Sequence, residues 1–373
     1  MSTKLAVNAS AAALAAAIAS PAFAGPTYEN DTGGSFTWYG QFDPSFQSYD
    51  DGTETYDRLV DNSGSNSRIG FRLKQAYGEN SLQFHFETAF GFRGSDGVSQ
   101  TSKGDSLSWD RTNLRHVDLQ FDTARFGRFS AGQGSMASDG IAGSDRSGTG
   151  LIAGVAVADS AGGYAFRDST GALTGPDVGD VFTDYDGSRL GRIRYDSNNF
   201  NGFVVSASYG TDILKDNNDR ETYDVAVRYG NENLGDFALE AALGAAWTEE
   251  TGQADKRDIA GSVALEHKPT GLSLAVAAGE RDIAGSYGYA KLGYSNTWTS
   301  LGATSFSVDY YDGSDMVDTA GDSASSWGIA AVQKFDRRNV EAYVAYREYS
   351  YSDTSGRSYN DSNVIMAGAR WKF

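Results

Sequence analysis

The chain has 373 residues, including 45 glycines, 21 tyrosines and 20 phenylalanines, and its formal net charge is -18. It contains no cysteine, which excludes disulfide frameworks, thiolate metal sites and cysteine nucleophiles. Acidic residues outnumber basic ones and no basic block occurs, which argues against a nucleic-acid partner, because such binding needs clustered Lys and Arg.

Residues 1–24, MSTKLAVNASAAALAAAIASPAFA, have the pattern of a secretory signal peptide. An early Lys4 precedes an Ala-rich apolar stretch, and a small-x-small motif ends at Ala24, after which we expect cleavage. The alternative is a short buried N-terminal helix. Removing one Lys and no acid changes the net charge from -18 to -19 for the mature domain, residues 25–373. No later run approaches the ~18 apolar residues that a membrane-spanning helix needs.

The rest of the chain alternates apolar and polar residues with a period of two, which predicts strands. In 67–74, SRIGFRLK, the residues Ile, Phe and Leu share one parity, and in 237–248, FALEAALGAAWT, Phe, Leu and Trp do. Tight polar links such as 231–236 alternate with longer polar connections, as in a meander. We count roughly 16 strands, an even number typical of bacterial outer-membrane barrels.

The two strand faces decide between a soluble β protein and a membrane barrel. The less apolar parity carries charges such as Arg68, Arg72 and Lys74, which do not suit a packed core. Aromatic residues such as Tyr209 and Trp247 gather at strand ends, as in the interfacial girdles of membrane barrels. We therefore predict an all-β transmembrane antiparallel β-barrel with its apolar parity facing lipid.

Two segments depart from this alternation. Residues 134–188 show none, and we expect this long connection to fold into the barrel, because its scattered apolar residues need cover. The alternative is a mobile external loop. In 114–121, LRHVDLQF, simple parity would turn Arg115 toward lipid, so either a bulge resets the register or Arg115 lies at a rim or subunit interface.

The order of several motifs resembles that of the trimeric general porins of Gram-negative outer membranes. These motifs are FTWYGQFD at 36–43, SRIGFRLK at 67–74, FGRFSAGQG at 126–134 before the long segment, and a last strand, VIMAGARWKF, that ends on Phe373. The resemblance implies a 16-stranded barrel, a homotrimer, a third loop folded inward to form the constriction, and contact with outer-membrane lipid and lipopolysaccharide. It also implies that Phe373 forms part of the signal read by the barrel-assembly machinery.

Charges that line the narrowest section set the selectivity of such a pore. Lumen parity and the resemblance together predict a basic wall and an acidic loop, with Arg68 in SRIGF as the most direct match. The predicted basic wall consists of Arg68, Arg72, Arg128, Arg192 and Arg194. The predicted acidic loop consists of Asp139, Asp145, Asp159, Asp168, Asp177, Asp180, Asp184 and Asp186. For any one of them, an ordinary solvated charge on a wet wall is the alternative. The third loop lacks the PEFGG segment of many family members, which puts residue-level assignment in doubt.

Enzymatic and metal motifs are weak. The three histidines, His85, His116 and His267, are scattered, and the chain has neither a G-x-S-x-G elbow nor an H-E-x-x-H motif. We therefore expect no enzymatic activity, no metal site and no cofactor. The acidic segments DILKDNNDRE and DGSDMVDTAGD contain oxygen ligands suited to Ca²⁺ but lack EF-hand spacing, so solvated loops are the default interpretation.

The sequence thus predicts a water-filled outer-membrane channel for passive diffusion of ions and small hydrophilic solutes. Because the eight loop aspartates outnumber the five wall arginines, we expect weak cation selectivity. Two alternatives are open: a substrate-selective porin, and, in a different class, a secreted soluble β-rich binding or adhesin protein.

Overall fold

A computed structural model describes residues 24–317 and 321–373. The predicted signal peptide lies outside the described residues except for Ala24. Among the described residues, no helix is long and apolar enough to cross a membrane.

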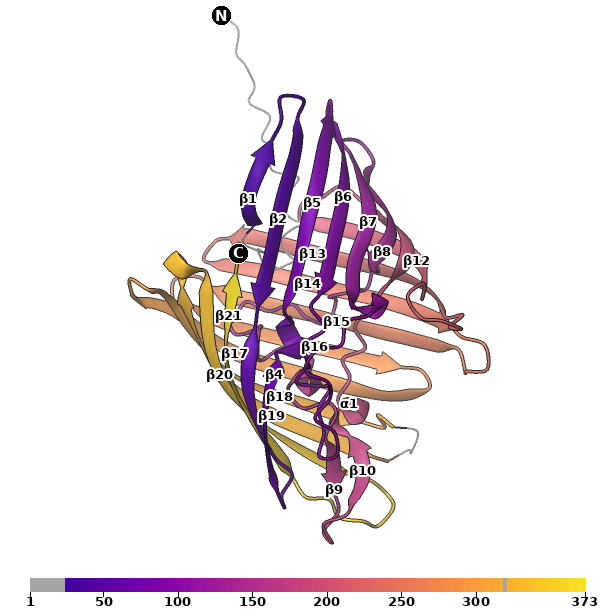
Figure 1. Ribbon diagram of the computed structural model, residues 1–373, viewed down its shortest axis with the longest axis vertical. Coiled ribbons are helices and arrows are strands. Elements are labelled where there is room, and N and C mark those ends of the chain that lie inside the picture. Colours follow the sequence, from indigo (N-terminus) through magenta and orange to yellow (C-terminus); the bar gives the residue numbers. More distant parts are fainter. Residues whose placement is uncertain (1–23, 318–320) are drawn as a thin grey trace, which may run out of the picture.

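The described chain forms a closed antiparallel β-barrel of sixteen strands (Figure 1), as predicted. Two barrel strands are interrupted: β2 continues as β3 past Asp43, and β4 continues as β5 past residues 62–67. The first half of the barrel comprises β2 (Gly34–Phe42), β3 (Pro44–Asp50), β4 (Thr55–Asp61), β5 (Arg68–Tyr77), β6 (Asn80–Ala89), β7 (Leu114–Thr123), β8 (Gly127–Ser135), β11 (Arg189–Asp196) and β12 (Phe203–Thr211). The second half comprises β13 (Glu221–Leu234), β14 (Phe237–Glu249), β15 (Lys256–His267), β16 (Leu272–Arg281), β17 (Ala284–Thr299), β18 (Gly302–Ser314), β19 (Ser323–Phe335), β20 (Val340–Ser352) and β21 (Ser362–Lys372).

The remaining elements lie outside the barrel wall or in its connections. The N-terminal strand β1 (Ala24–Glu29) pairs with β2. Short 3-10 helices occupy connections: η1 (Ser63–Ser65), η2 (Arg111–Asn113) and η4 (Asp336–Arg338). One rim of the barrel has tight links, such as those at 78–79, 124–126, 235–236 and 300–301, and we call it the short-turn rim.

The barrel closes between its first and last strands. Strand β21 pairs antiparallel with β3 and, at its end, with β2. Beyond the ladder, the amide of Gly40 donates to the Phe373 carbonyl over 2.9 Å, and the Phe373 amide donates to the Gly40 carbonyl over 3.0 Å. The first and last barrel strands are thereby paired, which closes the barrel seam.

The apolar parity faces outward. Leu243 is 55% exposed, whereas Ala242, its neighbour on the other parity, is buried at 9%. Ile193 on β11 is likewise exposed, and Arg192 beside it is buried. Since water would not favour a continuous exposed apolar band, this outer surface matches a lipid environment.

The long connection between β8 and β11, residues 136–188, packs against the inside of the barrel, as predicted. We call it loop 3. It contains η3 (Val157–Ser160), β9 (Ala165–Arg167), β10 (Leu173–Asp177) and α1 (Val178–Val181). Its apolar side chains are buried against tyrosines of the lumen wall, and the Phe182 ring lies 5.3 Å from the Tyr311 ring and 5.2 Å from the Tyr349 ring. In Figure 1 its elements β9, β10 and α1 lie in front of the strands β17–β19.

Polar contacts fix loop 3 to the wall. At its start, the buried carboxylate of Asp224 accepts hydrogen bonds from the Ser138 amide, 2.7 Å, and the Ser138 hydroxyl, 2.5 Å. Arg146 forms ion pairs of 2.7, 2.5 and 3.1 Å with carboxylates of three wall residues. These three residues are Glu232, Glu240 and Glu266. Because these contacts add to the apolar packing, the structure favours a fixed loop over a mobile one.

Candidate functional site

A basic cluster lies on the lumen wall, and it is built around the buried carboxylate of Glu87 on β6. Arg115 Nε donates to Glu87 Oε1 over 2.6 Å, and Arg68 Nε lies 3.6 Å from Glu87 Oε2. Arg370 and Arg189 add two further like charges that interact with Arg68. Arg68 and Arg115 share Glu87, whereas Arg189 pairs with Asp139 and Arg370 pairs with Glu341, so four arginines and three carboxylates leave this part of the wall positive by one charge.

A β-bulge explains how Arg115 reaches the lumen. Glu87 pairs with His116, but the next residue, Thr88, pairs with Leu114, so Arg115 is the extra residue. The bulge lets the Arg115 guanidinium turn inward to Glu87 instead of outward to lipid. Of the arrangements that the sequence left open, the bulge is the one observed.

Four aspartates of loop 3 form the acidic counterpart. Asp139 pairs with Arg189 at 3.4 Å, whereas within residues 24–317 and 321–373 no ion pair involves Asp159, Asp184 or Asp186. Burial, together with the nearby carboxylates of Asp96 and Asp184, raises the pKa of Asp159 to about 8. Burial and like charges also raise the pKa of Asp186 to about 7, and burial raises the pKa of Asp184.

A cavity of about 220 Å³ lies beside these acids. Asp159, Asp184 and Asp186 line it from loop 3, and Asn62 and Lys291 line it from the barrel side. The segment that carries Asn62 continues to Ser65, whose hydroxyl accepts a hydrogen bond from Arg370 over 2.5 Å. The acidic side of loop 3 therefore faces a segment that is linked directly to the basic cluster.

Only some of the arginines predicted for the basic wall lie in or near the basic cluster. Arg68 lies in the cluster, and the Arg72 guanidinium lies 4.6 Å from the centroid of the Tyr39 ring on the same strand pair. Arg128 pairs with Asp122 beside the 124–126 turn, at the short-turn rim. Arg192 and Arg194 form the compact ion pairs Arg192–Asp118 and Arg194–Asp196, each 2.7 Å long.

The predicted acidic loop divides in the same way. Asp139, Asp159, Asp184 and Asp186 lie at the site. Asp145 also lines the cavity, but it is paired with Lys291 at 2.8 Å. The other three stabilise nearby backbone. Asp168 accepts hydrogen bonds from backbone amides of its own turn, and Asp177 and Asp180 form the capping box of α1.

Sequence reasoning missed three of the four arginines in the basic cluster. Arg370 carries a readable signal, because it shares lumen parity with Lys372 on the last strand. Arg189 stands at the first residue of β11, where the end of loop 3 decides its direction. Arg115 depends on the bulge, for which the local sequence holds no marker.

The two acidic segments considered for Ca²⁺ contain residues with other partners. Asp212 pairs with Arg220 and Lys215, and Asp322 accepts hydrogen bonds from the amides of Met316 and Val317. Residues 318–320 lie outside the described part of the chain. The prediction for these segments stays that of solvated loops, with Ca²⁺ binding as the alternative.

A closed barrel with an apolar outer face and a lumen narrowed by an inserted, charged loop defines a membrane channel of the outer-membrane type. The family model described as Gram-negative porin matches residues 9–354. The chain therefore belongs to the Gram-negative porin family and is a protein of the bacterial outer membrane. Family and fold together indicate a channel rather than an enzyme.

Solved structures show the same fold at low sequence identity. The anion-selective porin from Comamonas acidovorans is 18% identical, with 91% of this chain and 100% of that chain covered and a TM-score of 0.60. OmpF of Salmonella typhi, in a complex with daunomycin, is 14% identical over 93% and 100%, with a TM-score of 0.59. OmpT of Vibrio cholerae is 16% identical over 93% and 100%, with a TM-score of 0.58. No curated protein sequence matches the chain significantly.

Proposed function

We propose that this outer-membrane channel is a general-diffusion porin, which lets ions and small hydrophilic solutes pass without energy input. The observation that carries this proposal is the position of loop 3: it packs inside the barrel, and its aspartates line a cavity together with Asn62, whose segment is hydrogen-bonded to Arg370 of the basic cluster. Opposed charges across a narrow aqueous passage orient polar solutes and hinder apolar ones.

We propose a weak preference for cations. Each arginine of the basic cluster lies beside a carboxylate, namely Glu87, Asp139 or Glu341, whereas Asp159, Asp184 and Asp186 form no ion pair among the described residues. The charges nearest to a permeating ion count most, because salt screens those beyond about 8 Å. Because the pKa of Asp159 is raised to about 8 and that of Asp186 to about 7, these acids are ionised, and leave the local balance negative, above about pH 8.

Reversal potentials across a planar bilayer under a KCl gradient test this proposal. Cation preference predicts a reversal potential with the same sign as the K⁺ equilibrium potential. The magnitude of this reversal potential should increase as the salt concentration is lowered. The opposite sign would mean that the arginines control the passage, an outcome with a precedent in the fold, since the Comamonas acidovorans relative is an anion-selective porin. Saturable block by one sugar or anion, absent with others, would instead identify a substrate-selective porin.

Homotrimeric assembly is also part of the proposal. It is supported by the family and by a trimer form of Vibrio cholerae OmpT, which is 17% identical. Native mass measurement in mild detergent tests it, and a monomer as the sole species would overturn it. The same measurement on protein purified from membranes tests cleavage after Ala24, because the mature chain should begin at Gly25.

We further propose that Phe373 acts in barrel assembly. Its ring lies 5.6 Å from the Trp38 ring and 5.1 Å from the Trp371 ring, where the two ends of the barrel meet. A terminal aromatic residue placed there links completion of the last strand to closure. Deletion of Phe373 should reduce the fraction of heat-modifiable, folded barrel in the outer membrane, and an unchanged fraction would remove this role.

A further inference from the structure

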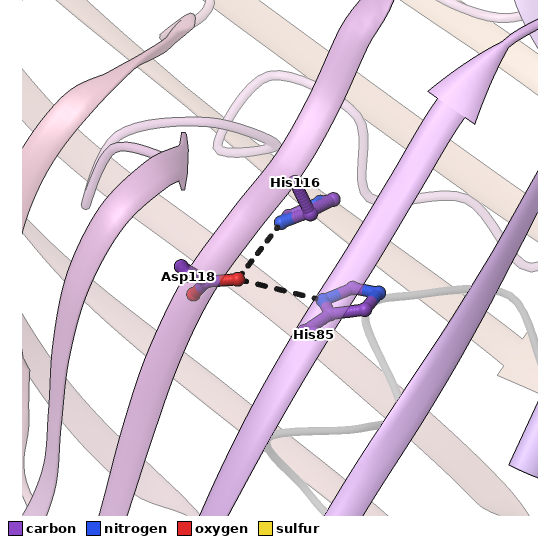
Figure 2. Close-up of side chains that lie close together, drawn as sticks. All are labelled: His85, His116 and Asp118. Carbon is purple, nitrogen blue, oxygen red and sulfur yellow. Dashed lines mark ion pairs between the residues drawn. The ribbon is translucent and has the colours of Figure 1, made fainter.

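Two histidines and an aspartate converge on β6 and β7 (Figure 2), beside the basic cluster built around Glu87. His85 and Asp118 are directly opposite each other in the ladder, and His116 precedes Asp118 by two residues on the same face. Asp118 Oδ1 lies 3.8 Å from the Nδ1 atoms of both His85 and His116. The two imidazole rings are stacked, with centroids 4.3 Å apart.

Neighbouring residues fix the orientation of His85. The Tyr39 hydroxyl donates its proton to Glu87 Oε2 over 2.7 Å, and its oxygen lies 2.6 Å from His85 Nε2. Since that proton is given to Glu87, His85 Nε2 must be the donor to Tyr39. The neutral ring then carries its lone pair on Nδ1, the atom that faces Asp118.

Asp118 is held in the same way. Its Oδ2 atom accepts hydrogen bonds from Arg192 Nη2, 2.7 Å, and Gln120 Nε2, 3.1 Å. Within residues 24–317 and 321–373, its Oδ1 atom has no hydrogen-bond partner, although the Asp118 side chain is fully buried, and His116 Nδ1 has none either. Contacts of 3.8 Å are too long for hydrogen bonds between these atoms.

In the tautomer of His116 that leaves Nδ1 unprotonated, each of these three atoms carries a lone pair, and both Nδ1 atoms lie 3.8 Å from Asp118 Oδ1. All three lie within 4.8 Å of each other. A buried acceptor without a partner costs free energy, and such groups in native structures call for an occupant. A cation placed among the three atoms would satisfy all of them at once.

We propose that His85 Nδ1, His116 Nδ1 and Asp118 Oδ1 bind one divalent transition-metal ion, with Zn²⁺ as the representative ion. Two imidazoles and one carboxylate are a ligand set typical of zinc sites that keep a fourth position open. Zinc at ~2.0–2.1 Å from each ligand places tetrahedral ligand atoms about 3.3 Å apart. Each Nδ1 must therefore come about 0.5 Å closer to Asp118 Oδ1 than the observed 3.8 Å, and ligand atoms up to 4.8 Å apart must approach by as much as about 1.5 Å, which requires the two rings to tilt toward each other. The partly exposed His116 side chain leaves the fourth position to water in the lumen.

Tyr39 and Glu87 act as positioning residues for this site. The Glu87–Tyr39–His85 chain fixes the tautomer of His85 and increases its basicity as a ligand, as outer-shell carboxylates do in zinc proteins. Arg192, beside Asp118 Oδ2, places a positive charge near the metal and lowers its affinity. We therefore expect an exchangeable ion rather than a permanently bound one.

Zinc titration of the full-length protein tests the site without reference to ion conduction. The protein is purified in detergent without a polyhistidine tag, stripped with EDTA, and titrated with ZnCl₂ by calorimetry. We expect one Zn²⁺ per chain, and we expect His85→Ala and His116→Ala to abolish this saturable binding. Tyr39→Phe should weaken it by about 10- to 100-fold. The matched control is His267→Ala, which removes the third histidine, hydrogen-bonded to Thr270 near the short-turn rim, and should change nothing.

Two further measurements keep the test decisive. Heat-modifiable migration of each variant on gels shows that its barrel is folded. Co²⁺ should give the intense visible absorption of a tetrahedral site in the wild type and in His267→Ala but not in His116→Ala. Absence of saturable binding in the folded wild type, or equal binding by His116→Ala and His267→Ala, would overturn the proposal.

Discussion

The ion preference of the channel should depend on pH, because its loop acids titrate near neutrality. Burial raises the pKa of Asp159 to about 8 and that of Asp186 to about 7. A raised pKa means that these carboxyls are largely neutral at low pH and become charged as the pH rises. From pH 6 to pH 9 the ionised fraction of a group with a pKa of 8 rises from ~1% to ~90%. The lumen therefore gains nearly two negative charges in this interval.

The size of the effect follows from Coulomb's law. A unit charge about 7 Å from a permeating ion, in a medium as polar as water, changes the energy of that ion by about 0.6 kcal/mol. Two such charges lower the energy of K⁺ by about 1 kcal/mol and raise that of Cl⁻ by about as much, which corresponds to about a thirtyfold increase in the preference for K⁺ over Cl⁻. High salt screens the interaction, so the increase should be largest in dilute KCl.

Reversal potentials measured between pH 6 and pH 9 check this prediction. The triple variant Asp159→Asn, Asp184→Asn, Asp186→Asn should lose the pH dependence. Asp168→Asn should keep it, because Asp168 bonds within its own exposed turn. A wild-type potential that does not change with pH, or a slope that survives in the triple variant, would refute the reasoning.

Three other predictions concern the wall, the loop and the seam. Arg115→Gln should raise the preference for K⁺ over Cl⁻ about sevenfold, because it removes ~0.6 kcal/mol of repulsion for K⁺ and about the same attraction for Cl⁻. Arg128→Gln at the short-turn rim should not change this preference, and equal shifts in reversal potential would contradict the assignment. Asp224→Ala should release the start of loop 3 and destabilise its contact with the wall by about 1.5–3 kcal/mol per lost charged hydrogen bond. Single-channel currents should then become noisier, and unchanged current noise would mean that Asp224 does not hold the loop. Gly40→Val should lower the yield of heat-modifiable barrel, because a Cβ at this position would lie 2.5 Å from the Phe373 ring and 2.9 Å from the Arg68 carbonyl. A normal yield would show that the first and last strands can shift to make room for the side chain.

The barrel was predictable because it follows from the pattern of apolar and polar residues within each strand. A period of two along a strand states which side chains face lipid, and residues 237–248 show this directly: Leu243 is exposed and Ala242 is buried. The inward position of loop 3 followed from the same reasoning, since apolar residues such as Val157, Val178 and Phe182 needed cover and found it on lumen tyrosines.

The site was predictable only where parity alone decides the direction of a side chain. Arg68 follows its strand and reaches the cluster. Arg115 follows a bulge, which depends on how β6 and β7 are paired rather than on any nearby residue. Arg192 also has lumen parity, but it forms an ion pair with Asp118, which neutralises its charge. Among the loop aspartates, tertiary partners separate Asp145, paired with Lys291, from those left without an ion pair.

The central claim is that loop 3 narrows a continuous aqueous path through the barrel. Single-channel recording of the purified protein in planar bilayers, with polyethylene glycols of graded size added to the KCl solution, tests it most directly. We predict stepwise, ohmic conductance that small glycols reduce in proportion to bulk conductivity and that larger glycols leave unchanged, because they cannot pass the constriction. Absence of conductance steps at any salt concentration, or equal reduction by glycols of every size, would contradict this account.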